Sequence, residues 1–378
     1  MKNPFVFGEA VRGEHFADRG NEYREIIRDL SHCQSIFLIS PRRYGKTSLI
    51  LKVLDELKKQ GFYTAYIDLY KVNSLQKFLE IYAREVARAV ESKLEKTFNF
   101  LRKTLPGLRP KISLHPDGTA TIGIEPIPKT EDVAKFLDEI YDLPQQLAEK
   151  KNRPYVMVFD EFQEIQYLNG DSMEKTMRAS FQHHDKVGYL FAGSKRHILY
   201  DMVSNPDRAF YKIGRIMTLD KLPEEEFGNF LLEAFEKTGY SLEEGAIPRL
   251  LEIVENYPYN AQYFCHKLWD DFADSRKISI NDLEPTLVCL LSENTPVYIS
   301  IWDGLSLHQR RVLISIAAHG GNSLFSQDFI SENNLGNSSS IQTSLRLLMK
   351  KQVLDKEENT YFITDVFFKE WIHRNMSG

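Results

Sequence analysis

Three adjacent residues, Lys46, Thr47 and Ser48, carry the amine and hydroxyl groups that bind phosphate. A phosphate-binding loop needs a buried strand, a tight turn with inward-pointing backbone N–H groups, and a lysine and hydroxyl that open a helix. In that pattern Lys46 reaches the β- and γ-phosphate oxygens and Thr47 binds Mg²⁺. The predicted nucleotide-binding residues of the loop are Ser40, Pro41, Arg42, Arg43, Tyr44, Gly45, Lys46, Thr47 and Ser48.

The surroundings of this loop matter more than the Gly-Lys-Thr tripeptide, which also arises by chance. The loop lies between an apolar run and an amphipathic helical pattern, and this context indicates a nucleotide site. Ser40 stands where the usual pattern begins with glycine. A serine costs little there if its backbone is still extended, and more if φ is positive.

A second polar element follows the apolar run Val156–Phe159 and consists of Asp160 and Glu161. Asp160 would hold Mg²⁺ through water, and Glu161 would orient or deprotonate the attacking water. The alternative is a polar strand end without chemistry. Presence of the phosphate loop in the same chain favours the metal and catalytic roles.

A third strand end supplies Ser194, a candidate sensor of the γ-phosphate, although a small residue in a turn would look the same. Arginines follow at 196, 208 and 215, and one of them could stabilise transition-state charge, in cis or across a subunit contact. Arg208 is preferred over Arg215, and a solvated surface role is the alternative for both. The predicted catalytic residues are Lys46, Glu161, Ser194 and Arg208, and the predicted metal-binding residues are Thr47 and Asp160.

Buried strands must alternate with helices to bring these polar residues together. The predicted strands are 35–39, 63–69, 155–159 and 189–192, and the predicted helices are 22–30, 47–59, 75–100 and about 131–150. This alternation predicts an α/β fold with a parallel sheet, and the phosphate loop makes that sheet typical of a P-loop NTPase. Five prolines and an HPDG turn near 105–129 predict a β-hairpin inserted into this core.

The rest of the chain predicts two further domains. We expect an ATPase core at 1–221, an all-α lid subdomain at 222–299 and a winged-helix domain at 300–378. Two amphipathic helical patterns and a terminal strand pair favour the winged helix. Its helices are expected at 309–319 and 338–351, and its strands at 353–355 and 361–363.

The charge of the C-terminal segment argues against DNA as its first partner. Over residues 300–378 four Lys and four Arg balance four Asp and four Glu, so the formal charge is zero. DNA-binding modules normally carry a basic stripe, because phosphate contacts dominate affinity. The expected wing tip, 355–358, also carries mostly acidic residues. A protein partner is therefore favoured over DNA.

Composition excludes several broad classes of protein. The 378 residues are 42% hydrophobic and 27% charged, with a formal net charge of −5, which is typical of a folded multi-domain protein. No run approaches the roughly 18 apolar residues of a membrane span, so no membrane association is expected. The three cysteines are too few and scattered for a disulfide framework or a zinc site. These features predict a cytoplasmic protein.

Taken in order, these elements resemble AAA+ P-loop ATPases, and more narrowly the archaeal-type ATPases related to the STAND class. The similar segments are FADRGNE at 16–22, SPRRYGKTS at 40–48, FDEFQEI at 159–165, FAGSK at 191–195 and YPYNAQ at 257–262. The resemblance implies that Arg19 borders the adenine and ribose and that Pro258 closes over the base. It also implies ATP rather than GTP. Asn256 and Tyr257 depart from the Gly-His or Gly-Asn common before that proline.

The resulting expectation is an ATP- and Mg²⁺-dependent switch with slow hydrolysis, whose lid and winged helix relay the nucleotide state to an unidentified protein partner. Two alternatives stay open. One is a DNA-associated AAA+ ATPase that resembles replication initiators, and the other is a nucleotide-binding scaffold with negligible turnover. A nucleotide-dependent homo-oligomer is compatible with each of them.

Overall fold

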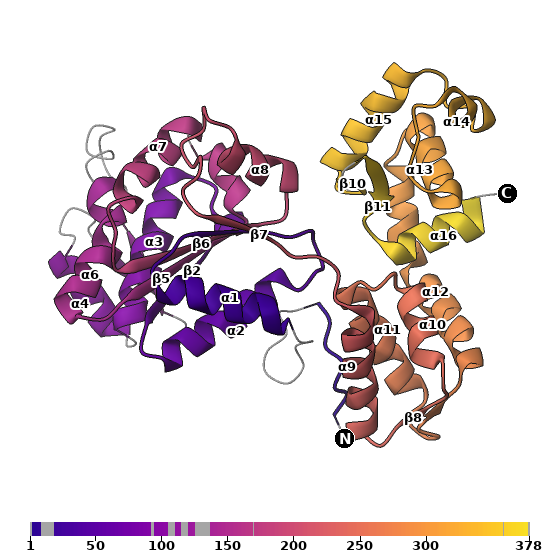
Figure 1. The fold of residues 1–378 in the computed structure, drawn as a ribbon, viewed down its shortest axis with the longest axis horizontal. Coiled ribbons are helices and arrows are strands. Elements are labelled where there is room, and N and C mark those ends of the chain that lie inside the picture. The colour runs from indigo at the N-terminus through magenta and orange to yellow at the C-terminus, as the bar shows by residue number, and fades with distance from the viewer. Residues whose placement is uncertain are drawn as a thin grey trace. The chain divides into compact units, whose positions relative to one another are not determined.

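The computed structural model describes residues 2–8, 19–91, 94–104, 110–114, 120–124, 137–168, 170–357 and 359–376. The chain divides into two compact units (Figure 1). The core unit contains Glu9–Lys221, and the C-terminal unit contains Leu222–Gly378 together with Met1–Gly8. Among the described residues, no helix is long and apolar enough to cross a membrane.

A five-stranded sheet organises the core unit. Its strands are β1 (Ile36–Ile39), β2 (Tyr63–Asp68), β5 (Tyr155–Asp160), β6 (Val187–Gly193) and β7 (Arg215–Thr218). They lie in the order β2-β5-β6-β1-β7, and every neighbouring pair is parallel. The predicted parallel α/β sheet is therefore confirmed. The sequence did not indicate β7, because this short edge strand is half exposed and lacks a continuous apolar run.

Helices cover both faces of this sheet (Figure 1). One face packs against α1 (Gly20–Ser31) and α2 (Lys46–Lys59). The other face packs against α3 (Leu75–Val90), α6 (Leu143–Lys151), α7 (Gly170–Phe181) and α8 (Arg196–Ser204). Within β5, Val156 and Val158 belong to the first core and Met157 and Phe159 to the second. A strand buried on both faces explains the continuous apolar run that precedes Asp160.

Two predicted helices differ in their bounds. The pattern at 75–100 forms two helices, α3 and α4 (Leu94–Thr104), rather than one. The helix expected near 131–150 has residues 137–141 in helical conformation followed by α6, while 131–136 lie outside the described residues. The inserted hairpin is present as β3 (Pro110–Leu114) paired antiparallel with β4 (Ala120–Ile124). Its flanking segments 105–109 and 125–129 lie outside the described residues.

The C-terminal unit begins with a helical part. Its elements are α9 (Glu224–Lys237), β8 (Ser241–Leu242), α10 (Ala246–Ile253), α11 (Pro258–Asp271), β9 (Lys277–Ile278) and α12 (Leu283–Asp303). The two short strands pair in parallel. Helix α12 packs against both α11 and the terminal helix α16 (Val366–Met376). The predicted boundary between residues 299 and 300 thus falls inside α12, a continuous helix.

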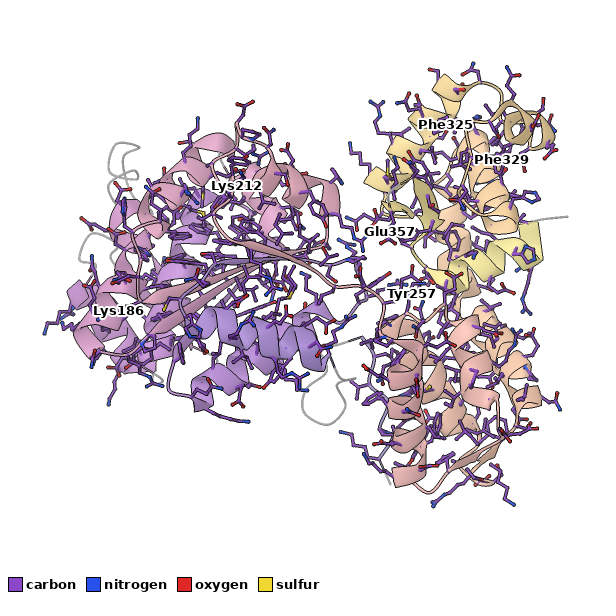
Figure 2. All side chains as sticks on the ribbon, in the orientation of Figure 1. Lys186, Lys212, Tyr257, Phe325, Phe329 and Glu357 are labelled. Atoms are coloured by element: carbon purple, nitrogen blue, oxygen red, sulfur yellow. The ribbon has the colours of Figure 1, made fainter. Side chains whose placement is uncertain are left out.

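The end of the chain has the elements expected of a winged helix. They are α13 (Leu307–His319), α14 (Gln327–Glu332), α15 (Ser338–Lys350), β10 (Leu354–Glu357) and β11 (Thr360–Ile363). Strands β10 and β11 form the antiparallel wing. Phe329 of α14 meets the ring of His319 of α13 edge-on at 6.2 Å (Figure 2). Phe367, Phe368 and Trp371 of α16 are buried, as expected of core residues.

Candidate nucleotide-binding and catalytic site

The phosphate loop connects the end of β1 to the start of α2. The Ser40 N–H donates to the Gly193 carbonyl at 3.1 Å, which continues the pairing of β1 with β6. Ser40 is not among the described residues with positive φ, so the serine carries no left-handed strain. Gly45 has φ of 82° and directly precedes Lys46, the first residue of α2. A glycine there lets the chain turn into the helix without a Cβ clash.

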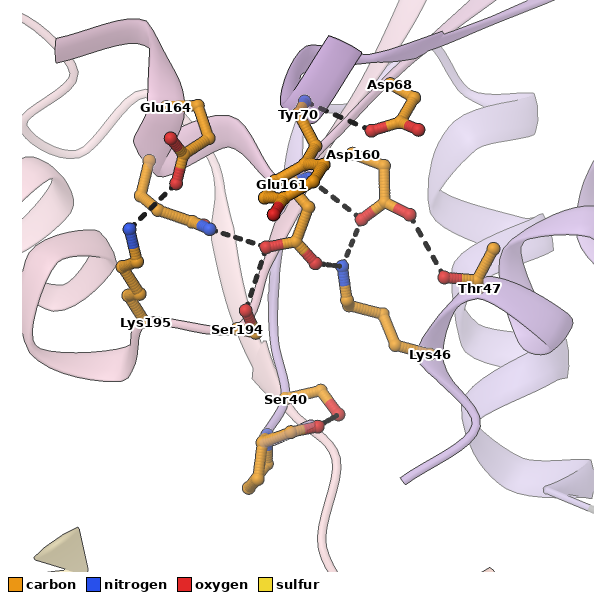
Figure 3. Close-up of polar contacts among 12 residues, drawn as sticks. Ser40, Lys46, Thr47, Asp68, Tyr70, Asp160, Glu161, Glu164, Ser194 and Lys195 are labelled. Carbon is orange, nitrogen blue, oxygen red and sulfur yellow. Dashed lines mark hydrogen bonds and ion pairs between the residues drawn. The ribbon is translucent and has the colours of Figure 1, made fainter. Parts of the chain in front are cut away.

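Lys46 brings the loop and the end of β5 together. Its ammonium lies against Asp160 and is 2.9 Å from Glu161 Oε1, in a largely buried position (Figure 3). Since α2 begins at Lys46, its free N–H groups and positive dipole end face the same region as this ammonium. The sequence prediction that Lys46, Asp160 and Glu161 form one site is consistent with this geometry.

Asp160 is the best-connected carboxylate of the site. Oδ1 accepts hydrogen bonds from Lys46 and from the Glu161 N–H at 2.9 Å. Oδ2 accepts from Thr47 Oγ1 at 3.1 Å and from the Tyr66 hydroxyl at 2.8 Å. A carboxylate offers about four lone-pair sites, so these four donors fill them. Burial, followed by the charge of Asp160, raises the pKa of the Tyr66 hydroxyl, which therefore stays a donor.

Glu161 is held from three sides. Its Oε2 accepts from Gln163 Nε2 at 2.5 Å and from Ser194 Oγ at 2.8 Å, while Oε1 faces Lys46 (Figure 3). Burial raises the pKa of the Glu161 carboxyl, but the charge of Lys46 and these hydrogen bonds outweigh it and leave the pKa lowered. The carboxylate is therefore ionised at neutral pH, the form needed in a general base.

The donor set suits Mg²⁺ bound with a nucleotide. Thr47 and Asp160 present hydroxyl and carboxylate oxygens, which are the hard ligands this cation prefers. Two carboxylates, Asp160 and Glu161, face one ammonium, so the cluster has an excess of negative charge that a cation would offset. No group of three or more His, Cys, Asp or Glu in the described parts of the chain could hold a metal ion. Mg²⁺ would instead complete its ligands with phosphate oxygens and water.

Arg19 links the loop to the end of the core unit, an arrangement called the Arg19 clamp. It is 3% exposed, and its guanidinium donates to the carbonyls of Tyr44 at 3.0 Å and Asp220 at 2.8 Å. It also pairs with Glu22. Burial lowers the pKa of Arg19, partly offset by Glu22, and the side chain remains charged. Its predicted contact with the adenine and ribose stays a prediction, and residues 16–18 of the same segment lie outside the described residues.

The other predicted residues are distributed differently. Pro41, Tyr44 and Ser48 are buried in the loop, while Arg42 and Arg43 are exposed on it. Pro258 is the first residue of α11 in the C-terminal unit, so its contact with the base remains a prediction.

The predicted arginines have partners away from this cluster. Arg208 pairs with Asp201 and with Glu174, whose side chain is 1% exposed. Arg215 of β7 pairs with Glu25 and Asp29 of α1. These contacts indicate structural roles, and a role of either arginine in transition-state stabilisation stays a prediction.

Two residues of the site were not singled out from the sequence, Tyr66 and Gln163. Tyr66 looks like a core aromatic of β2, and only the pairing of β2 with β5 places it beside Asp160. Gln163 follows Glu161 by two residues and is fully buried. It packs directly against Gly193, where the Cβ of any other residue would lie only 2.0 Å from Gln163 Oε1. A glutamine in the acidic segment FDEFQEI was the available signal.

Solved structures with the same fold extend over nearly the whole chain. The Walker-type ATPase PABY2304 of Pyrococcus abyssi has a TM-score of 0.68 and 18% identity, covering 98% of this chain and 99% of that one. The Aeropyrum pernix ORC2 protein, solved as ADPNP–ADP complexes, has a TM-score of 0.55 and 15% identity, with 96% of each chain covered. The Aeropyrum pernix ORC1 protein in complex with DNA has a TM-score of 0.50 and 11% identity, covering 97% and 94%. At these identities the likeness concerns the fold alone.

Family models agree with these folds. No curated protein matches the chain in sequence. A model described as a probable winged helix domain matches residues 296–374. A model described as an ATPase domain predominantly from Archaea matches residues 16–259, which include the loop, Asp160, Glu161 and Ser194. Because this match spans more than half of the chain, the protein belongs to that family of P-loop ATPases and ends in a winged helix domain.

Proposed function

We propose that this protein is a slowly hydrolysing, STAND-like ATP switch that passes its nucleotide state to a protein partner. The carrying observation is the Arg19 clamp. One buried guanidinium joins the carbonyl of Tyr44 in the phosphate loop to that of Asp220, two residues before the C-terminal unit begins. A shift of the loop on nucleotide binding would therefore move Arg19 and, through it, the backbone at Asp220, where the chain leaves the core unit.

The site supplies the groups for binding and hydrolysis. Lys46 would leave its carboxylates for the β- and γ-phosphates, and the first N–H groups of α2 would hold the same phosphates. Thr47 and Asp160 would hold Mg²⁺, which would supply positive charge to offset the charge of the phosphates. Ser194 and Gln163 orient the Glu161 carboxylate, which would then accept a proton from the attacking water. Slow turnover is proposed because Glu161 Oε1 must lose its Lys46 partner before it can accept a proton.

The surface of the winged helix favours a protein partner. Along α15 the exposed charged side chains are Arg346 and Lys350, with exposed Leu347 between them. Glu357, at the end of β10, is exposed on the wing (Figure 2). A helix with two cations and a wing with an acidic end provide little attraction for a phosphate backbone. The three free cysteines agree with our proposal of a reducing cytoplasm.

A second candidate is a DNA-associated ATPase. The observation in its favour is the fold of the Aeropyrum pernix ORC1 protein, which was solved in complex with DNA and resembles this chain over nearly its full length. The formal charge of zero over residues 300–378 weighs against it. Duplex binding that weakens with salt would support this candidate.

The deciding experiment measures ATP affinity and turnover of the full chain, with and without duplex DNA at low salt. We expect ATP binding and slow hydrolysis that DNA does not stimulate. Glu161→Gln should keep ATP affinity and reduce kcat by roughly 100-fold or more, because a general base contributes about that much. The matched control is Glu164→Gln, which removes a nearby carboxylate paired with Lys195.

Each outcome separates the candidates. Equal turnover in wild type and Glu161→Gln would remove the catalytic role of Glu161. ATP retained without turnover would identify the scaffold alternative, and DNA-stimulated turnover would identify the DNA-associated one. Molecular mass in solution with and without ATP would reveal a nucleotide-dependent homo-oligomer.

A further inference from the structure

Tyr66 lies on β2, the strand that neighbours β5 in the sheet. The two strands pair in register, with Tyr66 opposite Val158 and Asp68 opposite Asp160. The ring of Tyr66 packs against the core beneath α1 and α2, and its hydroxyl reaches Asp160 Oδ2 at 2.8 Å. The tyrosine thus approaches the metal-site carboxylate from the strand beside it.

We propose that Tyr66 is a positioning residue that fixes Asp160 for Mg²⁺ in the nucleotide-bound state. This inference rests on the proposed Mg²⁺- and ATP-dependent function. It goes beyond that function by assigning a role to a residue that belongs neither to the phosphate loop nor to the β5 strand end.

Four donors hold Asp160 in this structure. Lys46 and Thr47 are the groups that phosphate and Mg²⁺ would engage, so their hold on Asp160 weakens when nucleotide binds. The Glu161 N–H and the Tyr66 hydroxyl remain as donors. The Glu161 N–H donates to Oδ1, so once Thr47 has left, Tyr66 is the remaining one of the four donors on Oδ2. Tyr66 is therefore the contact that keeps Oδ2 in place during the exchange of partners.

Its position on the sheet makes this contact rigid. Both ends of the hydrogen bond lie on adjacent strands joined by a regular parallel ladder, and the Tyr66 ring is half buried. While Oδ2 is fixed by Tyr66, Oδ1 points to the position that the Lys46 ammonium would vacate when it turns to the phosphates. Hydrogen bonds to a metal-binding carboxylate typically affect metal affinity by 10- to 100-fold.

The test compares Tyr66→Phe with the wild type and with Tyr63→Phe. Tyr63 lies on the same strand, and Tyr63→Phe also removes one phenolic hydroxyl. Its ring packs with Tyr155 and Arg153, away from Asp160. The readout is Mn²⁺ affinity of the full-chain ADP complex, measured by electron paramagnetic resonance, together with ADP affinity in EDTA. Neither measurement requires turnover. The Mg²⁺ concentration for half-maximal ATP hydrolysis gives a third value.

We expect Tyr66→Phe to weaken Mn²⁺ binding about 10-fold and to raise the Mg²⁺ requirement similarly, with ADP affinity in EDTA unchanged. Tyr63→Phe should match the wild type. Replacing Tyr66 by p-aminophenylalanine, which keeps an N–H donor at the same position, should restore much of the Mn²⁺ affinity. This rescue distinguishes the donor from the shape of the ring.

Unchanged Mn²⁺ affinity in Tyr66→Phe would overturn the inference and leave the proposed function intact. An equal loss of ADP affinity in EDTA would also overturn it, because that pattern indicates a damaged site rather than a misplaced carboxylate. A wild-type protein whose ADP complex binds no Mn²⁺ would overturn both proposals. If Tyr66→Phe does not fold, failure of p-aminophenylalanine to preserve wild-type Mn²⁺ affinity would overturn the inference.

Discussion

Two of the described strands that end on an acidic residue, β5 and β10, differ in what surrounds that end. At the end of β5, Asp160 and Glu161 are surrounded by a lysine, three hydroxyls and a side-chain amide. At the end of β10, Glu357 is exposed and the neighbouring Lys356 lies over the Tyr361 ring. Two opposite charges attract each other weakly in water, whereas the same attraction in a partly buried cluster is strong and depends on the geometry of the groups. Acidic residues at a strand end therefore acquire function through the donors that neighbouring strands and loops supply.

Lys46→Ala should break the buried cluster most severely. Two carboxylates would lose their ammonium, and removing one partner of a buried pair costs about 3–5 kcal/mol of unfolding free energy. Chemical denaturation without nucleotide measures this loss, with exposed Lys58→Ala on the same helix as control, expected within about 0.5 kcal/mol. Mg-ATP affinity should also fall roughly 10- to 100-fold. An unchanged affinity would show that the site is wrongly assigned.

Arg208→Leu tests a second buried carboxylate, Glu174. We expect a loss of about 2–3 kcal/mol in unfolding free energy, because Glu174 would remain buried without its guanidinium. Combining Arg208→Leu with Glu174→Leu should recover much of it, since both charges are then removed. A fall in kcat at unchanged stability would instead support transition-state stabilisation by Arg208.

Ser194→Ala removes one of the hydrogen bonds that orient Glu161. Losing about 1 kcal/mol of positioning should lower kcat about 5- to 10-fold, with ATP affinity and stability nearly unchanged. Single-turnover kinetics measure this step, and exposed Ser204→Ala on α8 is the control. If both variants hydrolyse ATP at the wild-type rate, Ser194 has no part in catalysis.

Glu357→Lys on the wing should have the smallest effect. A single exposed charge changes stability by less than about 0.5 kcal/mol, and ATP turnover should be unaffected. Duplex binding should stay undetectable at low salt, as measured by fluorescence anisotropy. Salt-sensitive DNA binding that appears in this variant would mean that the wing can approach a DNA backbone and would weaken the contrast between the two strand ends.

Much of the fold could be predicted because local patterns determined it. Strands buried on both faces left continuous apolar runs, as at β5, and the helix at α2 left a regular apolar spacing. The edge strand β7 was not predicted because Arg215 and Ile216 are exposed and only Met217 is buried. The domain boundary expected between 299 and 300 stays a prediction, and it lies within α12, which shows no break there even with Pro296 inside it.

The residues of the candidate site also differ in whether a local pattern could predict them. Lys46, Thr47, Asp160 and Glu161 could be found because a motif links residue type to position. Tyr66 could not, since its role depends on which strand lies beside β5, and this is a long-range pairing. The contact of Arg19 with the adenine stays a prediction. Its bonds to the backbone carbonyls of Tyr44 and Asp220 could not be predicted, because a carbonyl has no side-chain signature.

The left-handed backbone of Glu161 has a consequence for laboratory evolution. With φ of 52°, this residue occupies a conformation that costs most side chains about 1–2 kcal/mol and that glycine or asparagine adopts more readily. A library selected only for heat resistance would therefore gain backbone free energy by replacing the proposed general base. Selection for thermostability at this position must be coupled to selection for turnover, or the more robust variants will be inactive.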